Sequence, residues 1–215
     1  MTRPTRRTRP SDRGRRGNLP SRPARPRGGI RTEFERLTGE IRACRLCPLG
    51  STRSHAVVYR GALAPRVVFV GEAPGVEEDR TGVPFVGRSG RVLDATIVRL
   101  GLSAREFGVL NVLKCRPPHN RFDRAAARTC RPYLERQLAL LRPRVLVPLG
   151  ANALKTLDPA APPILRCAGT PRGRPGAPQL FPLVHPAASL RSRLLRERWQ
   201  KDVELLAAWL GSGVV

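Results

Sequence analysis

The chain has 215 residues, 40% of them apolar, and it contains no run near the roughly 18 consecutive apolar residues that suggest a membrane-spanning helix. These figures predict one soluble globular domain with a sizeable core and no membrane segment. The formal net charge of +24 favours a polyanionic partner, most simply nucleic acid. An anionic membrane surface is the competing partner, but no strongly amphipathic basic helix supports it.

Residues 1–30 differ in composition from the rest of the chain. They hold ten arginines and five prolines against a single acid, Asp12. Such a segment cannot bury enough apolar surface to fold, so we expect a disordered basic tail followed by a folded domain over residues 31–215. Clustered arginines suit a phosphate-contacting arm better than a passive solubilising tail. A cleaved targeting peptide is disfavoured because the segment has no apolar core.

The clearest structural signal lies between residues 67 and 94. Val67 to Val70 form an apolar, β-branched run that predicts a buried parallel strand. The strand ends in the sequence GEAPG at residues 71–75, and its glycines permit a sharp turn at the edge where open α/β sheets bind ligands. Four acids gather at or just after this turn: Glu72, Glu77, Glu78 and Asp79. The alternative interpretation is an ordinary strand-to-helix connection with solvated acids.

The rest of the chain alternates helical and strand patterns. We expect helices over residues 32–43, 89–100 and 190–210, and one or two over 123–141 that Pro132 interrupts. Strands are expected over residues 108–113, 144–149 and 181–184, with a long loop over 158–180. The packing face expected for the last helix is Leu194, Trp199, Val203, Leu206 and Leu210. Alternation of this kind predicts an α/β fold with a parallel sheet.

Four of the five cysteines have a spacing that indicates a metal or redox site. Cys44 and Cys47 form a C-x-x-C pair, Cys115 and Cys130 follow far downstream, and Cys167 stands apart and is expected to be structural. A reducing cytoplasm disfavours disulfides. A thioredoxin-like role is disfavoured because the C-x-x-C pair precedes the first strong strand. Four thiolates suit both zinc and an iron–sulfur cluster, although the wide gap is unusual for a zinc ribbon.

Several of these segments resemble motifs of the family 4 uracil-DNA glycosylases, which are repair enzymes with an iron–sulfur cluster. Residues 71–94, GEAPGVEEDRTGVPFVGRSGRVLD, resemble the first motif of that family. Residues 111–118, NVLKCRPP, resemble its NVVKCRPP segment, and the cysteine spacing resembles its cluster ligands. Residues 185–191, HPAASLR, resemble HP-x-x-L-L-R, with Ser189 where leucine is common. The resemblance spans residues 31–210 and implies a three-layer α/β/α sandwich around a central four-stranded parallel sheet.

The resemblance also implies a set of site residues. Those expected to bind uracil are Gly71, Glu72, Ala73, Glu78, Phe85, Asn111 and His185. Those expected to hold a [4Fe–4S] cluster are Cys44, Cys47, Cys115 and Cys130. Glu72 and His185 would be catalytic: His185 would donate to uracil O2, where negative charge develops, and Glu72 would support the cationic sugar and the attacking water.

The remaining implied roles concern recognition of the base. Phe85 would stack on a uracil flipped out of the duplex, and Glu78 would lie near uracil C5. Asn111 offers both a donor and an acceptor, which the O4 and N3–H edge of uracil requires.

The expected function is therefore a monofunctional uracil-DNA glycosylase of base excision repair, a cytoplasmic monomer that acts on uracil in single- or double-stranded DNA. An X-type relative that cross-links to its abasic product through a histidine, here His119, is one alternative. The turn GEAPG and the short loop around His119 argue against it. The others are a catalytically silent cluster-containing nucleic-acid-binding protein and a small-molecule nucleotide enzyme. The acidic first turn, which lacks G-x-G-x-x-G, disfavours the nucleotide enzyme.

Overall fold

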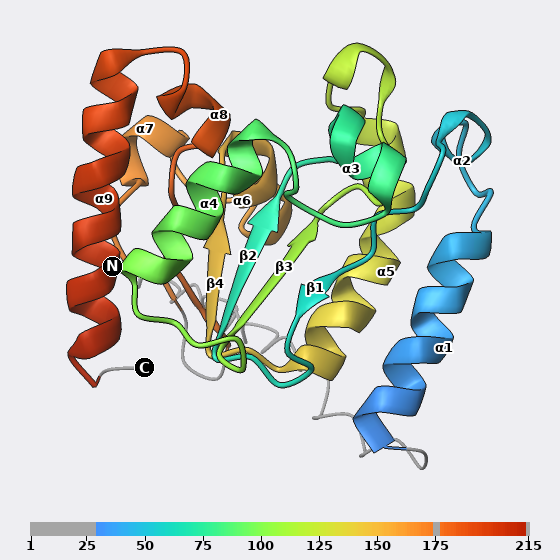
Figure 1. Ribbon diagram of the computed structural model, residues 1–215, viewed down its shortest axis with the longest axis horizontal. Helices are drawn as coiled ribbons and strands as arrows, with labels where there is room; N and C mark the ends of the chain where they lie inside the picture. Colours follow the sequence, from blue (N-terminus) through green and yellow to red (C-terminus); the bar gives the residue numbers. More distant parts are fainter. Residues whose placement is uncertain (1–28, 174–176, 214–215) are drawn as a thin grey trace, which may run out of the picture.

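The computed structural model describes residues 29–173 and 177–213. A five-stranded sheet in the order β1-β3-β2-β4-β5 forms its middle layer (Figure 1). The strands are β1 (Arg60–Gly61), β2 (Val67–Gly71), β3 (Phe107–Asn111), β4 (Val145–Pro148) and β5 (Gln179–Leu180). β2 to β5 run parallel, and β1 pairs antiparallel with β3. The predicted tail falls almost wholly on residues 1–28, outside the described part of the chain.

The strands form the core of the sheet because their residues are apolar on both faces. In β2, Val67 and Phe69 pack into one cluster, while Val68 and Val70 pack into another on the opposite face. All four side chains are fully buried. A strand covered on both sides reads as a continuous apolar run, and this is the pattern from which β2 was predicted.

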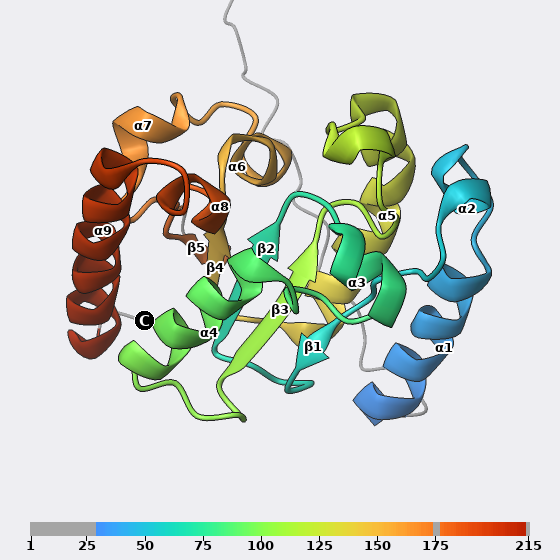
Figure 2. The same ribbon diagram turned by 45° about the horizontal axis from the view of Figure 1, so that its top comes forward.

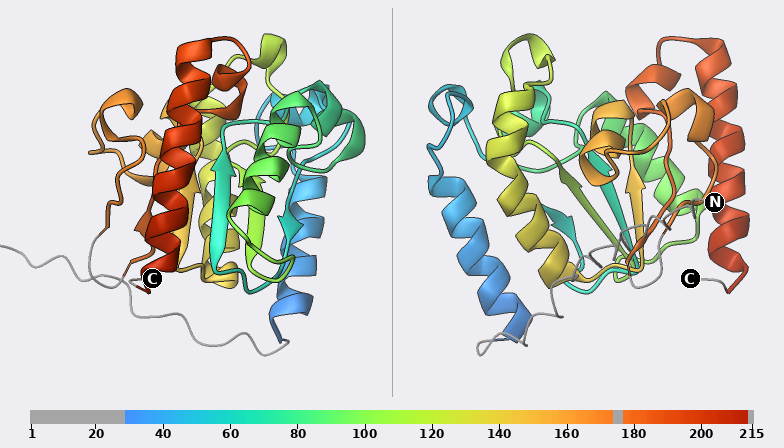
Figure 3. Two further views of the ribbon diagram at one scale, coloured as in Figure 1. Left: turned by 60° about the vertical axis from the view of Figure 1, so that its left-hand side comes forward. Right: turned by 180° about the vertical axis from the view of Figure 1, so that it is seen from behind.

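Helices cover both faces of the sheet, as Figures 1 and 3 show. On one face, α4 (Arg88–Arg99) and α9 (Arg193–Gly211) supply Leu93, Ile97, Trp199 and Leu206 to the core. The opposite face is covered by α1 (Gly29–Ala43), α5 (Arg124–Leu141) and α6 (Ala151–Leu157). The predicted three-layer sandwich with four parallel strands is confirmed. The antiparallel β1 was not predicted, because two residues carry no periodicity.

The short elements gather around the carboxyl ends of the parallel strands, the edge that Figure 2 brings forward. They are α2 (Leu49–Thr52), α3 (Val76–Thr81), a 3-10 helix (Pro118–Asn120), α7 (Ile164–Cys167) and α8 (Pro186–Ser189). Of these, α3 and α8 directly follow segments with the predicted site residues. No helix in the described ranges is long and apolar enough to cross a membrane.

Two predictions about helices were wrong. Pro132 does not interrupt α5, which runs unbroken from Arg124 to Leu141. The helix buries Cys130 and Leu134 on either side of the proline, and this packing offsets a loss of about 3 kcal/mol from an interior proline. Leu194 does not pack, since its side chain is 73% exposed. It lies five residues before the buried Trp199, a spacing that does not keep one face of a helix.

The predicted fourth strand is displaced, and the predicted long loop over 158–180 contains α7. β5 ends at Leu180, one residue before the predicted span of 181–184 begins. Pairing nevertheless continues, because the Phe181 N–H donates to the Leu146 carbonyl at 2.9 Å and the Leu183 N–H to the Pro148 carbonyl at 3.0 Å. Pro182 lies between them and has no N–H to donate, so a regular strand is not maintained.

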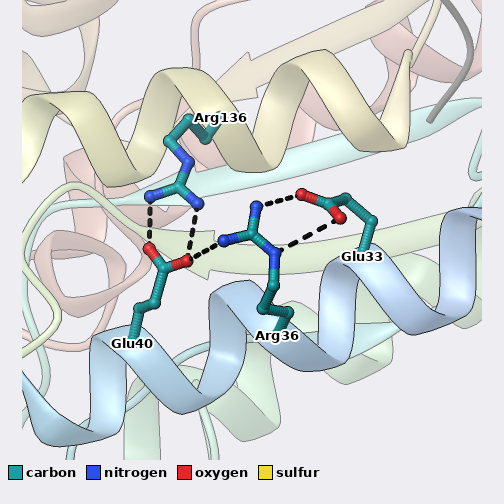
Figure 4. A network of polar contacts seen from close by, with 4 residues as sticks. All are labelled: Glu33, Arg36, Glu40 and Arg136. Carbon is teal, nitrogen blue, oxygen red and sulfur yellow. Dashed lines mark hydrogen bonds and ion pairs between the residues drawn. The ribbon is translucent and has the colours of Figure 1, made fainter. Parts of the chain in front are cut away.

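A charged network fastens α1 to α5 (Figure 4). Arg136 of α5 donates two hydrogen bonds to Glu40 of α1, one of them at 3.0 Å. Arg36 joins Glu40 to Glu33 along α1. Hydrogen bonding by Arg136 is the main cause that lowers the pKa of Glu40. The network holds together the two helices that lead to Cys44 and carry Cys130.

Candidate active site and four-cysteine pocket

The carboxyl ends of β2 and β3 bring Gly71 and Asn111 together. These residues are register partners in the parallel ladder. Gly71 is required here by space, because a methyl group in its place would stand 2.5 Å from the ring of Phe85 and would also collide with the Asn111 side-chain oxygen. The backbone at Gly71 therefore lies against both predicted base-binding side chains.

Asn111 is the most unusual polar residue of this edge. Its side chain is 1% exposed, yet neither its amide nitrogen nor its amide oxygen has a hydrogen-bond partner among the described residues. An unsatisfied buried amide costs on the order of 1–3 kcal/mol per group, so a native protein keeps one only for a reason. Both a donor and an acceptor are held ready for a ligand.

Phe85 lies against Gly71, as does Asn111, and its ring is near that of His185. Its backbone adopts φ 57°, which is rare for a residue with a side chain, and its ring is buried. Gly90, in the first turn of α4, lets the Phe85 backbone approach closely, since any side chain there would strike the Phe85 carbonyl. The ring centroid lies 6.2 Å from that of His185 with the planes 31° apart.

His185 caps the start of α8 in a defined tautomer. Its Nδ1 accepts a hydrogen bond from the Ala187 N–H at 3.1 Å, so in the neutral ring the proton sits on Nε2. Burial lowers the pKa of His185 to about 4, with Arg191 lowering it further and Glu78 opposing the shift. At neutral pH the residue is therefore an uncharged Nε2–H donor. Gly150, with φ 93°, gives the imidazole room beside the end of β4.

Glu78 joins two turns of this edge. Its carboxylate accepts from the Gly75 N–H at 3.0 Å and from the Val86 and Gly87 N–H groups at 2.9 and 2.8 Å. The GEAPG turn is thereby tied to the segment that presents Phe85. The bond to Gly75 is the capping-box contact that an acid at the third position of α3 can make, whereas the bonds to Val86 and Gly87 carry no signal in the sequence.

Glu72 and Ala73 complete the first turn. Both side chains are partly buried, and Ala73 packs against the core on the α5 side of the sheet. The Glu72 carbonyl accepts from the Leu113 N–H at 3.0 Å, which fixes its backbone beside the end of β3. Within the described ranges its carboxylate makes no hydrogen bond or ion pair, so the charge remains available.

The four predicted ligand cysteines line one cavity, together with Arg53 and Lys114 among other residues. Cys44 and Cys47 lie in the loop between α1 and α2, Cys115 lies in the segment after β3, and Cys130 lies in the middle of α5. All four are free thiols. No group of three or more His, Cys, Asp or Glu side chains in the described residues is arranged to hold a metal ion. Cys167 is buried in α7 and is not among the residues that line this cavity.

Two cations face the cysteines, and the sequence analysis identified neither. Arg53 donates to the Cys115 sulfur at 2.9 Å and to the Cys44 carbonyl at 3.0 Å. Burial raises the pKa of the Cys115 thiol, and Arg53 opposes that shift. Lys114 is fully buried, and burial lowers its pKa to about 7 against the opposing effect of Cys130 and Cys115. Basic side chains beside thiols favour thiolates and suit an anionic metal centre.

Asp79 also has a role that the sequence did not reveal. This buried residue of α3 accepts two hydrogen bonds from the Ser54 N–H, at 3.1 and 3.2 Å. It follows Glu78 in the chain, so the two acids fasten α3 to the loop after α2 and to the active-site turns. His119, in contrast, lies exposed with φ 52° in the 3-10 helix after Cys115.

Comparison with known proteins agrees with this geometry. The family model for the Uracil DNA glycosylase superfamily matches residues 58–208. A type-4 uracil-DNA glycosylase of Thermotoga maritima is 38% identical over 175 residues, which are 80% of this chain and 91% of that protein. One of Pyrobaculum aerophilum is 37% identical over 190 residues, 85% of this chain and 95% of that protein. A type-5 enzyme of Mycobacterium leprae is 33% identical over 54% of this chain.

The sheet with its ligand-ready edge and the family match define a member of the uracil-DNA glycosylase superfamily. Within that superfamily, the chain belongs to the type-4 uracil-DNA glycosylases, since it covers nearly the whole length of several of them. The family resemblance seen in the sequence motifs is thus confirmed.

Proposed function

We propose that this protein is a DNA repair enzyme that flips uracil out of DNA and hydrolyses its N-glycosidic bond, leaving an abasic site. The observation that carries the proposal is the buried, unpartnered amide of Asn111 beside Phe85 and His185. An amide donor and acceptor match the O4 and N3–H edge of uracil. Cytosine presents the opposite pattern at that edge and is rejected.

Breaking the bond requires stabilisation of two opposite charges. The base leaves as an anion and the sugar takes on oxocarbenium character. His185 donates its Nε2 proton in a hydrogen bond to uracil O2, and because the ring is uncharged it needs no anionic partner. Glu72, whose carboxylate is unengaged, supports the sugar cation and orients the attacking water.

Stacking and exclusion complete the recognition of the base. Phe85 stacks on the flipped uracil, and its unusual backbone angle is held by close packing at Gly71 and Gly90. Gly71 and Ala73 line the base site through the backbone and a small side chain. Glu78 approaches uracil C5, where a thymine methyl group would meet it, while its backbone hydrogen bonds keep the two turns in register.

We further propose that Cys44, Cys47, Cys115 and Cys130 hold a [4Fe–4S] cluster. Support comes from the convergence of the four cysteines on one cavity and from the two neighbouring cations. A centre that spans several ångströms fits thiols from three separate chain segments better than a single zinc ion does. When bound, the cluster supplies a cross-link between these segments, since the hydrolysis needs no electron transfer.

The partner is uracil-containing DNA, in single or double strands, and we propose a cytoplasmic monomer. The arginine-rich segment over residues 1–30 would add phosphate contacts without sequence information. Removing residues 1–28 should then weaken DNA binding and flatten its salt dependence while the chemical step is retained. An unchanged salt slope would assign the segment a passive role.

We propose release of a free abasic site and not the cross-linking outcome of X-type relatives. His119 lies exposed in a short loop, whereas a nucleophile must sit about 3–3.5 Å from the carbon that it attacks. A denaturing gel of protein with uracil-containing single strands tests this point. A band shifted by the mass of the protein, and abolished in His119→Ala, would overturn it.

Matched oligonucleotides that contain uracil, thymine or cytosine at one position test the main proposal. After incubation, alkali should cleave only the uracil strand. Cleavage of none of the strands, or of all three equally, would contradict the proposed function.

A further inference from the structure

Lys114 is the one lysine in the described ranges whose side chain is buried, with 1% exposure. Within those ranges it makes no ion pair with a carboxylate. A buried cation is costly unless a negative charge and hydrogen-bond acceptors compensate it. The groups that surround Lys114 therefore indicate which acceptors and negative charges compensate its buried ammonium group.

The ammonium group faces two sites at once. Its Nζ donates to the carbonyl oxygen of Asn111, three residues earlier. Lys114 also lines the cavity that the four cysteines share, and its own backbone N–H donates to the Cys130 thiol. Lys114 thus lies between the carbonyl of the base-reading residue and two of the four cysteines.

Backbone hydrogen bonds join the segment Asn111–Lys114 to the end of β2 and to the loop before β1. The Val112 N–H donates to the Gly71 carbonyl at 2.9 Å, and the Leu113 N–H to the Glu72 carbonyl at 3.0 Å. The Lys114 carbonyl accepts from the Val57 N–H at 2.7 Å. The Asn111 carbonyl accepts from the Lys114 Nζ, so the 111–112 peptide, next to the Cα that bears the Asn111 amide, is bonded at both its carbonyl and its N–H.

We propose that Lys114 is a positioning residue that couples the four-cysteine pocket to uracil recognition. Its charge compensates the thiolates of Cys115 and Cys130, and its N–H donor fixes Asn111 in the orientation that reads the base. The inference rests on the proposed function and extends it, because it makes the bound metal centre and the base site share one side chain.

Two substitutions separate the charge of Lys114 from its donor. Lys114→Met keeps an unbranched side chain that is one atom shorter, and it removes both properties. Lys114→Gln has the same reach as methionine, removes the charge and retains an N–H donor for the Asn111 carbonyl. Lys155→Met is the matched control, since Lys155 also donates to carbonyl oxygens, at 2.6 Å to Ala161 and 3.2 Å to Pro159, but lies on α6 and does not line the four-cysteine cavity.

The first measurement is the affinity for free uracil by calorimetry. Lys114→Met should bind uracil about tenfold more weakly, because a hydrogen bond from a charged donor is lost. Lys114→Gln and the Lys155→Met control should both stay within about twofold of the wild type. A merely structural role would lower the melting temperature without this split between Met and Gln.

The second measurement is the rate at which iron is lost to a chelator. Lys114→Gln and Lys114→Met should both lose iron faster than the wild type and the control, because both lack the compensating charge. Wild-type uracil affinity in Lys114→Met, or wild-type iron retention in Lys114→Gln, would overturn the proposal.

Failure of the proposed function gives a different result. Wild-type protein without iron and without uracil excision would refute the function itself. An active, iron-containing wild type with indistinguishable Lys114 variants would refute the role of Lys114 alone. Should Lys114→Met fail to fold, the iron retention of Lys114→Gln still decides the matter.

Discussion

The base-reading edge and the four-cysteine pocket are assembled in different ways. Gly71 and Asn111 meet because they end neighbouring parallel strands, and the sheet fixes their separation whatever is bound. The cysteines come from the loop between α1 and α2, the segment after β3 and the middle of α5, which no ladder connects. The first site is preorganised by the fold, whereas the second holds three chain segments that a bound centre would bridge. Changes at the edge should alter chemistry, and loss of a pocket cysteine should alter stability.

The largest effect is expected from His185→Ala. Loss of the neutral Nε2–H donor should lower single-turnover uracil excision about 10²–10³-fold with little change in melting temperature. His55→Ala is the control, because this exposed histidine bonds only to the Asp79 backbone among the described residues. A wild-type rate in His185→Ala would place the donor elsewhere.

The next largest effect should come from Cys130→Ser, and it should fall on stability. Loss of a cluster ligand from α5 should release iron and lower the Tm by about 5–10 °C. Cys167→Ser is the matched control, since that thiol is equally buried but lies in α7 outside the pocket. Iron analysis and thermal unfolding check both points. Equal iron loss in Cys130→Ser and Cys167→Ser would contradict the assignment of the metal ligands to the four-cysteine pocket.

Asn111→Asp should alter base selectivity with the fold intact. A carboxylate cannot donate to uracil O4, so excision of uracil should fall roughly 10–100-fold, the value of one matched pair of base-edge hydrogen bonds. Discrimination against cytosine should narrow by a similar factor. Competition between uracil- and cytosine-containing strands measures the ratio. An unchanged ratio would show that Asn111 does not read the base.

A small effect is expected from Arg136→Gln. This substitution removes the ion pair with Glu40 between α1 and α5, but both partners are substantially exposed, at 40% and 33% of their side chains. The free energy of unfolding should fall by less than about 1 kcal/mol, and less still at high salt. Arg131→Gln, which pairs with Glu135 within α5, is the control. Urea titrations at two salt concentrations measure the free energy of unfolding of both variants and of the wild type. A loss that does not shrink at high salt would contradict an exposed ion pair.

No effect of His185 protonation is expected between pH 8 and pH 5. Burial places its pKa at about 4, below the ordinary 6.5, so the ring stays neutral and gains a proton only as the pH falls through about 4. Single-turnover rates should therefore show no acidic limb near pH 6.5. A limb there would mean that the imidazole is solvated and that its charged form differs in activity.

The sequence predicted the parts of the molecule that depend on local pattern. β2 and β3 follow from apolar runs, and the placement of Gly71 and Asn111 at one edge follows from the parallel arrangement. Cysteine spacing predicted the membership of the pocket. These features need only the chain order and the period of each element.

The parts that could not be predicted depend on where side chains reach across elements. The carboxylate of Glu78 accepts from the N–H groups of Gly75, Val86 and Gly87, and only the bond to Gly75 follows from a spacing rule, that of the capping box. Lys114 could not be distinguished in the sequence from the many other basic residues of the chain. Its role follows from its burial beside the cysteines, which only the structure shows. Pro132 was misjudged since packing of α5 outweighs local propensity.

Direct observation of the Asn111 side-chain amide is the closest test of whether this residue reads the base. In protein labelled with ¹⁵N-asparagine, the Asn111 side-chain NH₂ signals, identified by their absence in Asn111→Asp, can be followed as free uracil or cytosine is added. Uracil should shift the Asn111 side-chain signals, and cytosine should leave them in place. The signals of Asn120, whose side-chain oxygen accepts a hydrogen bond from Arg116, should stay unchanged with either base. If the Asn111 signals do not shift at uracil concentrations that inhibit excision, Asn111 does not bind the base.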